Sequence, residues 1–202
     1  MTKGDASLYE PSVGCYDVSV SNGDMAIVLD LGAIHDATEL EPPYAEVRAI
    51  AATVLLERNH GPRERDPAEL HHEDRRRSAQ LIRRAVTRRA DLTYDEPIQV
   101  TEEAAEAVAF LVARRVLDRI AYARCRTRTG ADYRLHRPGA ADSDAYERLE
   151  VSGIGGGTER AVSRLREKLM RLAEYPEEPP GFAIVTNFRD DPVEILVGRH
   201  AP

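Results

Sequence analysis

Cysteine, tryptophan and lysine are scarce in this chain, and the scarcity of cysteine already limits the kind of protein it is. The 202 residues include no tryptophan and only two cysteines, Cys15 and Cys125. Two cysteines so far apart indicate separate thiols rather than a disulfide framework. The chain also lacks an apolar run approaching the roughly 18–20 residues of a spanning helix, and its first residues lack the basic and apolar regions of a signal peptide. We therefore expect a cytoplasmic protein without a membrane segment.

Positive charge comes almost entirely from arginine, since Lys3 and Lys168 are the only lysines among 28 basic residues. The formal net charge of −7 argues against a surface that coats nucleic acid in general. A local exception is the arginine-rich stretch 75–89, which we predict to belong to a helix over 68–90. Its arginines fall on a broad sector of that helix and are suited to follow a phosphate backbone. The alternative is a solvated helix paired with acidic neighbours.

The N-terminal half predicts a hairpin followed by helices. Residues 16–20 and 25–33 read as two strands joined by Ser-Asn-Gly-Asp, because Asn-Gly favours a tight turn. Residues 44–59 repeat apolar side chains at three- and four-residue steps, the period of a helix. The stretch 68–90 carries a thinner apolar face that we read with the same period.

The C-terminal half alternates helices and strands. Thr101 is a suitable N-cap for a long helix over 101–125. Shorter elements follow: strands at 131–136 and 146–154, a helix at 158–173, and strands at 182–188 and 193–199. This order predicts an α/β (α+β) fold with a mixed central sheet flanked by helices. We divide it into an N-terminal hairpin with a helical extension (1–100) and an α/β core (101–202), together one compact unit.

Two carboxylates in the C-terminal half form a candidate site. Side chains alternate along a strand, so Glu150 and Ser152 share one face of the strand 146–154. If this strand forms a hairpin with 131–136, Asp132 and Glu150 lie near each other. Two carboxylates and a backbone carbonyl suffice to hold Mg²⁺, which usually keeps several waters. Such an ion can position a water and stabilise charge on a phosphodiester.

This arrangement resembles the PD-(D/E)xK nuclease superfamily. Its restriction-endonuclease-like core runs from a helix to a hairpin with an acidic residue, then to a strand with Glu-x-Lys, a helix and a further strand. The resemblance covers residues 101–199: Asp132, in GADYRLH, matches the first acidic position, and Glu150, in LEVSG, matches the second. It implies that both carboxylates bind Mg²⁺, that the carbonyl of Val151 is a further ligand, and that the substrate is DNA or another nucleic acid.

The sequence departs from the family pattern at Ser152, which stands where the family has its lysine. A serine cannot supply the positive charge with which that lysine helps to activate water and to stabilise the transition state. Some members of the superfamily carry the lysine on the following helix instead. Lys168 lies on the predicted helix 158–173, although several turns from its start. The resemblance therefore implies Asp132, Glu150 and Lys168 as the catalytic set.

Plainer interpretations of the same residues stay open. Glu150 can be an exposed residue of a sheet covered on one face, and Asp132 can be a turn residue. The glycines within 153–157 indicate either a flexible turn or a phosphate cradle at a helix N-terminus. They lack the lysine and the spacing of a P-loop.

Three functions follow from these readings. The first is a Mg²⁺-dependent phosphodiesterase that acts on DNA, or a nucleic-acid-associated subunit, which the element order and the two carboxylates favour. The second is a catalytically degenerate nuclease fold that serves as a protein–protein interaction subunit of a larger complex or a homo-oligomer. The acidic net charge and the missing motif lysine favour this second function. The third is a small-molecule enzyme that uses the glycine-rich turn at 153–157.

Overall fold

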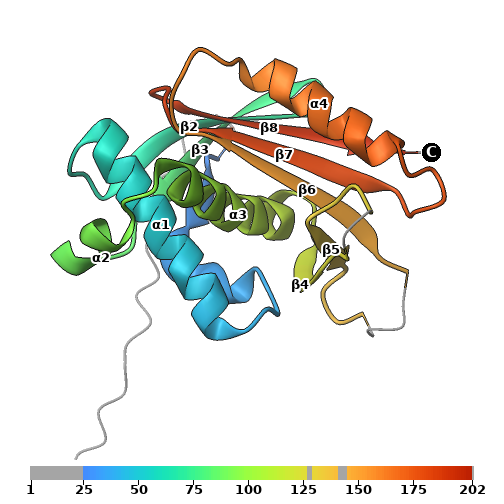
Figure 1. Ribbon diagram of the computed structural model, residues 1–202, viewed down its shortest axis with the longest axis horizontal. Coiled ribbons are helices and arrows are strands. Elements are labelled where there is room, and N and C mark those ends of the chain that lie inside the picture. The colour runs from blue at the N-terminus through green and yellow to red at the C-terminus, as the bar shows by residue number, and fades with distance from the viewer. Residues whose placement is uncertain (1–24, 127–128, 141–144, 202) are drawn as a thin grey trace, which may run out of the picture.

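The computed structural model describes residues 25–126, 129–140 and 145–201, and it shows a mixed α/β fold built on one eight-stranded sheet (Figure 1). The strand order is β1-β3-β2-β8-β7-β6-β5-β4. The strands are β1 (Ile27–Asp30), β2 (Arg65–His72), β3 (Arg75–Ile82), β4 (Ile120–Arg124), β5 (Tyr133–His136), β6 (Glu147–Ile154), β7 (Gly181–Asn187) and β8 (Val193–His200). The described helices are α1 (Pro42–His60), α2 (Arg88–Thr93), α3 (Pro97–Val116) and α4 (Ala161–Ala173), with a 3₁₀ helix at Leu31–Asp36. The predicted fold class is confirmed.

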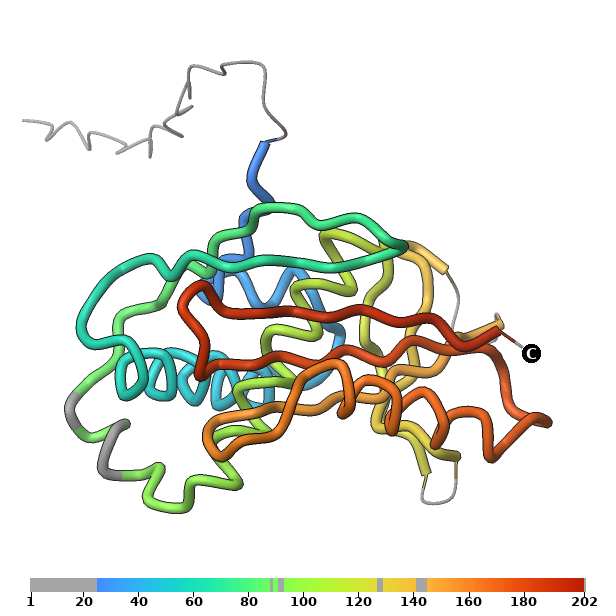
Figure 2. Tube along the Cα trace, turned by 90° about the horizontal axis from the view of Figure 1, so that it is seen from above, coloured from blue at the N-terminus to red at the C-terminus, as the bar shows by residue number. Residues whose placement is uncertain are grey.

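Helices lie on both faces of the sheet. α1 and α3 pack together on one face, and α4 lies along β6, β7 and β8 on the other (Figure 1 and Figure 2). Buried alanines on α1 and α3, such as Ala49, Ala52, Ala105 and Ala109, let these helices pack closely because a methyl side chain keeps little distance between two helices. A smaller cluster of Ile154, Ala161, Val185 and Leu196 lies under α4. Strand β6 therefore runs between α3 and α4.

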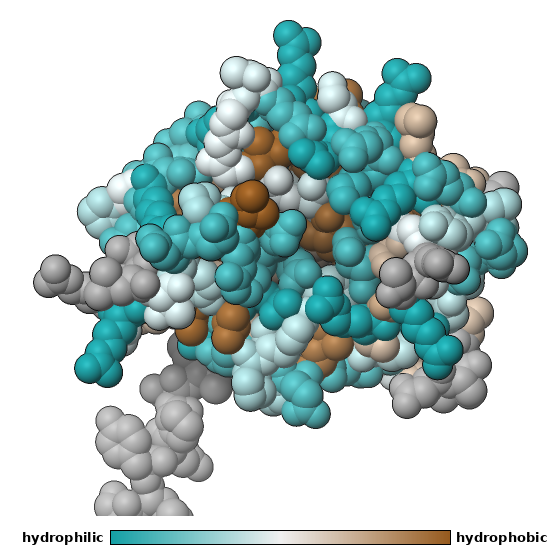
Figure 3. Space-filling view, viewed as in Figure 1, coloured by the Kyte–Doolittle hydropathy of each residue, from teal (hydrophilic) through white to brown (hydrophobic). Residues whose placement is uncertain are grey.

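The surface seen in the view of Figure 1 is mainly hydrophilic. Apolar side chains appear there as separate patches rather than as one continuous area (Figure 3). The large apolar side chains that are exposed in the described residues are Met25, Val28, Val47, Ile98, Val162 and Met170. No helix in the described part of the chain is long and apolar enough to span a membrane.

The predicted helix over 68–90 is wrong. Residues 65–82 form the antiparallel hairpin β2–β3, whose turn residues Glu73 and Asp74 have φ of 50° and 59°, and only residues 88–90 of the segment are helical, at the start of α2. The buried positions recur every second residue, as at Ala68 and Leu70 in β2, and this is the period of a strand rather than of a helix. The few apolar residues of this segment lie among many charged ones, so their spacing fits the period of a strand as well as that of a helix.

The arginine-rich helix predicted at 75–89 is therefore wrong as well. Arg75, Arg76 and Arg77 lie exposed on β3. Arg83 instead turns inward, where its guanidinium donates hydrogen bonds of 2.6 and 2.7 Å to the buried carboxylate of Asp66. These arginines do not form one helical surface.

Two other predicted boundaries differ from the structure. The first strand of the N-terminal hairpin, 16–20, lies outside the described residues. Within the second predicted strand lies β1, which pairs in parallel with β3.

The helix predicted at 101–125 begins earlier, at Pro97, and ends at Val116. Asp118 then adopts a φ of 52°, which a continuing helix does not allow. Residues 120–124 form the edge strand β4, so three consecutive antiparallel strands, β4, β5 and β6, precede α4.

Candidate functional site

The predicted hairpin exists and places Asp132 at an open strand edge. β5 pairs with β6 only through residues 147–149, and the Asp132 side chain takes over where the pairing ends. Asp132 Oδ2 accepts a 2.8 Å hydrogen bond from the backbone N–H of Val151. Because the N–H and C=O of one strand residue point to the same side, the Val151 carbonyl also faces this open edge.

Glu150 lies on the face of β6 that α4 covers, and it is fully buried. Lys168 Nζ donates a hydrogen bond to Glu150 Oε1 at 2.7 Å, and Arg171 Nη1 donates to the same oxygen at 3.1 Å. The second oxygen, Oε2, is buried without a hydrogen-bond partner. The alternative of Glu150 as an exposed strand residue is wrong, since its carboxylate is enclosed beneath two cations.

Lys168 reaches Glu150 although it lies two turns into α4. The helix connects the parallel strands β6 and β7, so it runs back over β6. From Glu150 to the end of β6 the strand advances about 13 Å, and from the start of α4 to Lys168 the helix returns about 10 Å. These two lengths nearly match, so the helix brings Lys168 back to the level of Glu150. The sequence alone indicates this once α4 is assumed to connect two parallel strands. Arg171 was not predicted, yet it follows Lys168 by three residues and so shares its helix face.

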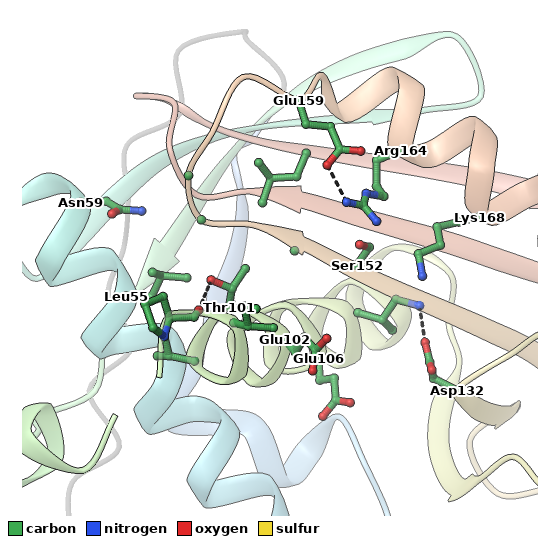
Figure 4. A pocket seen from close by; sticks show the side chains of 18 of the residues that line it. Leu55, Asn59, Thr101, Glu102, Glu106, Asp132, Ser152, Glu159, Arg164 and Lys168 are labelled. Atoms are coloured by element: carbon green, nitrogen blue, oxygen red, sulfur yellow. Dashed lines mark hydrogen bonds and ion pairs between the residues drawn. The ribbon is translucent and has the colours of Figure 1, made fainter. Parts of the chain in front are cut away.

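A cavity of about 780 Å³ opens beside this cluster, between α3 and α4. Figure 4 shows Thr101, Glu102 and Glu106 reaching it from α3, Asp132 and Ser152 from the hairpin, and Arg164 and Lys168 from α4. Glu150 itself lies behind this wall, under Lys168, whose side chain is 12 % exposed. The catalytic set implied by the resemblance therefore converges at one end of the cavity.

The pKa of Glu150 is raised to about 7, chiefly by burial and also by the negative charge of Asp132; the hydrogen bond and charge of Lys168 and the charge of Arg171 act in the opposite direction. Near neutral pH, Glu150 is thus poised between its protonated and ionised forms. Binding of a cation would favour the ionised form.

The arrangement fits a hard divalent cation better than a structural zinc ion. The described residues contain no group of three or more histidine, cysteine, aspartate or glutamate side chains suited to hold a metal, whereas zinc takes three or four such ligands. Asp132, the unpaired Oε2 of Glu150 and the Val151 carbonyl offer three oxygen ligands. Mg²⁺ accepts a few protein oxygens and completes its shell with water.

Glycine at two positions lets β6 lie tightly against α3. A Cβ at Gly153 would come within 2.6 Å of the Thr101 carbonyl oxygen, and a Cβ at Gly155 would overlap the Thr101 side chain. These two glycines serve a close approach of backbone to helix. At Gly156, by contrast, nothing lies within 4 Å of an added Cβ.

Replacement of Gly153 by alanine is expected to lower the free energy of unfolding by about 1–3 kcal/mol, because the added methyl group overpacks the contact with Thr101. Gly156→Ala is the matched control and should change it by less than about 1 kcal/mol. Urea denaturation of both variants measures the difference. Equal stability of the two would show that β6 has room to move away from α3.

Comparison of the chain with protein-family models, curated proteins and solved structures finds no match. The assignment of a function therefore depends on the geometry of this site.

Proposed function

We propose that this chain is a Mg²⁺-dependent phosphodiesterase of the PD-(D/E)xK kind that acts on nucleic acid. The observation that carries the proposal is the 2.7 Å contact between Lys168 Nζ and Glu150, beside Asp132. Lys168 thereby supplies the positive charge that the family's lysine would supply from the position of Ser152. The order α3, β4–β5, β6, α4, β7 also follows the order of that family's core.

Asp132, Glu150 and the carbonyl of Val151 are the residues that would hold the ion. When bound, Mg²⁺ supplies a Lewis acid and lowers the pKa of a coordinated water. The N–H of Val151 fixes the orientation of Asp132. Lys168 and Arg171 stabilise the ionised form of Glu150, which burial opposes.

Lys168 has a second role at the cavity wall. Its ammonium group is preorganised by Glu150, so it can face the charge that develops on a phosphoryl oxygen without a reorganisation cost. Arg164 lines the same cavity and is held by Glu159 through a 2.5 Å hydrogen bond. Because the predicted helix 75–89 does not exist, we assign phosphate contacts to these cavity cations rather than to the exposed arginines of β3.

The test is cleavage of plasmid DNA with Mg²⁺ and with EDTA. Wild type is expected to cleave only with Mg²⁺, and Glu150→Ala and Lys168→Met to be slower by about 10²–10³-fold, the range found when one preorganised transition-state contact is removed. Glu174→Ala, at an exposed side chain that does not line the cavity, is the control and should retain activity.

Equal, negligible cleavage by wild type and Glu150→Ala would overturn the enzymatic proposal. The catalytically degenerate interaction subunit would then be the better account. Under that account Glu150→Ala leaves a partner complex intact, and substitutions on the surfaces of α1, β2 and β3 disrupt it.

A further inference from the structure

A second cavity, of about 770 Å³, lies at the far end of the β5–β6 hairpin. It shares no lining residue with the cavity beside Lys168. Its polar and aromatic lining includes Arg119, Tyr122, Arg134, His136, Arg137 and Tyr146. Nothing in the proposed phosphodiesterase chemistry uses these side chains.

Three arginines and the carboxylate of Glu147 line this second cavity, and the carboxylates of Glu39 and Glu178 contact its His136 and Tyr146. Arg119 forms an ion pair with Glu147. Within the described ranges, no carboxylate lies within ion-pair distance of Arg134 or Arg137. Two guanidinium groups are therefore available to an anion, and a guanidinium matches the geometry of a phosphate oxygen pair.

Buried polar atoms in the cavity wall lack hydrogen bonds. His136 is only 5 % exposed; its Nδ1 atom has no hydrogen-bond partner, and its Nε2 atom lies at ion-pair distance, 3.1 Å, from Glu39 Oε2. The Nε atom of Arg134 is likewise buried and unpaired. Buried polar groups without partners are costly, so a polar ligand that reaches them gains affinity.

Aromatic rings complete the site. The rings of Tyr122 and His136 lie 4.6 Å apart at 58°, and the Arg134 guanidinium lies over the Tyr146 ring at 4.5 Å from its centroid. Flat rings beside guanidinium groups suit a ligand that joins a base to a phosphate, because bases stack on aromatic side chains. We propose that this second cavity binds a nucleotide, either a free mononucleotide or the end of a single strand.

Calorimetric titration of the full chain in EDTA tests the site without cleavage. Adenosine 5′-monophosphate is expected to bind at least about tenfold more tightly than inorganic phosphate, because the base adds stacking. Arg134→Gln and the exposed Arg137→Gln should each weaken this binding by about tenfold, the loss of one charge-assisted contact. Arg76→Gln on β3 makes the same charge change at a 66 % exposed side chain and should have no effect.

A four-nucleotide single strand distinguishes the two sources of ligand. Tighter binding than the mononucleotide, lost in Arg134→Gln, assigns the site to a strand end, and equal binding assigns it to a free nucleotide. Undetectable binding of the mononucleotide, equal affinity for inorganic phosphate, or an equal loss in Arg76→Gln overturns the inference. Glu150→Ala should bind normally, so this site can be present even if the chain cleaves no DNA.

Discussion

Replacement of Arg148 by methionine is expected to lower the free energy of unfolding by about 3–5 kcal/mol, because it removes the guanidinium donor from three carbonyl groups, two of them in buried contacts. Arg148 is fully buried. Its guanidinium donates to the carbonyl oxygens of Pro179 at 2.6 Å, Thr129 at 2.8 Å and Leu172 at 3.0 Å. The side chain thereby joins β6 to the loop before Asp132 and to the end of α4.

Arg148 is two residues from Glu150, so its loss should also loosen the geometry of the site. Chemical denaturation measures the stability, with an unchanged denaturant slope as the sign that the folded state is retained. Arg166→Met on the exposed side of α4 is the matched control and should stay within about 0.5 kcal/mol of wild type. A loss below about 1 kcal/mol for Arg148→Met would mean that water replaces the guanidinium at these carbonyls.

Replacement of Glu150 by glutamine is expected to remove a pH dependence of stability. The folded-state pKa of Glu150 is raised from 4.5 to about 7 by burial and by Asp132. The unfolded chain therefore releases this proton first as the pH rises. The contribution of Glu150 to stability is present in full below pH 4.5 and is lost as the pH rises to about 7, a change of about 3 kcal/mol at about 1.4 kcal/mol per pKa unit.

Glutamine keeps the shape of Glu150 and stays neutral. At pH 8 the Glu150→Gln variant should therefore be more stable than wild type, even though it loses the proposed activity. A side chain whose ionised form lowers the stability of the folded protein is expected at a functional site. Unfolding curves at pH 5 and pH 8 measure the effect, with Glu174→Gln at an exposed side chain of α4's C-terminal end as the control. A variant that is less stable than wild type at both pH values would show that the ion pair with Lys168 serves the fold.

The sequence correctly predicted the hairpin that brings Asp132 towards Glu150, because strand alternation and the intervening turn are local properties. It did not predict how close Lys168 comes to Glu150, because that distance depends on the direction in which α4 runs over β6. It also led to a wrong helix at 68–90, where a sparse apolar pattern fits a strand as well as a helix. Arg83 illustrates the reason: its inward position depends on the buried Asp66 on the neighbouring strand.

By itself the sequence determined the mixed α/β class, the order of elements from β5 to β8 and the alternation that places Glu150 and Ser152 on one face. These follow from backbone periodicity and from turn chemistry, which act over a few residues. Only the tertiary structure decided that Glu150 is enclosed, that Lys168 and Arg171 share its Oε1, and that Arg148 binds three carbonyl groups. Burial and charge pairing arise between segments far apart in the chain, so the protonation of Glu150 is a property of the packed layers and not of the strand 146–154 alone.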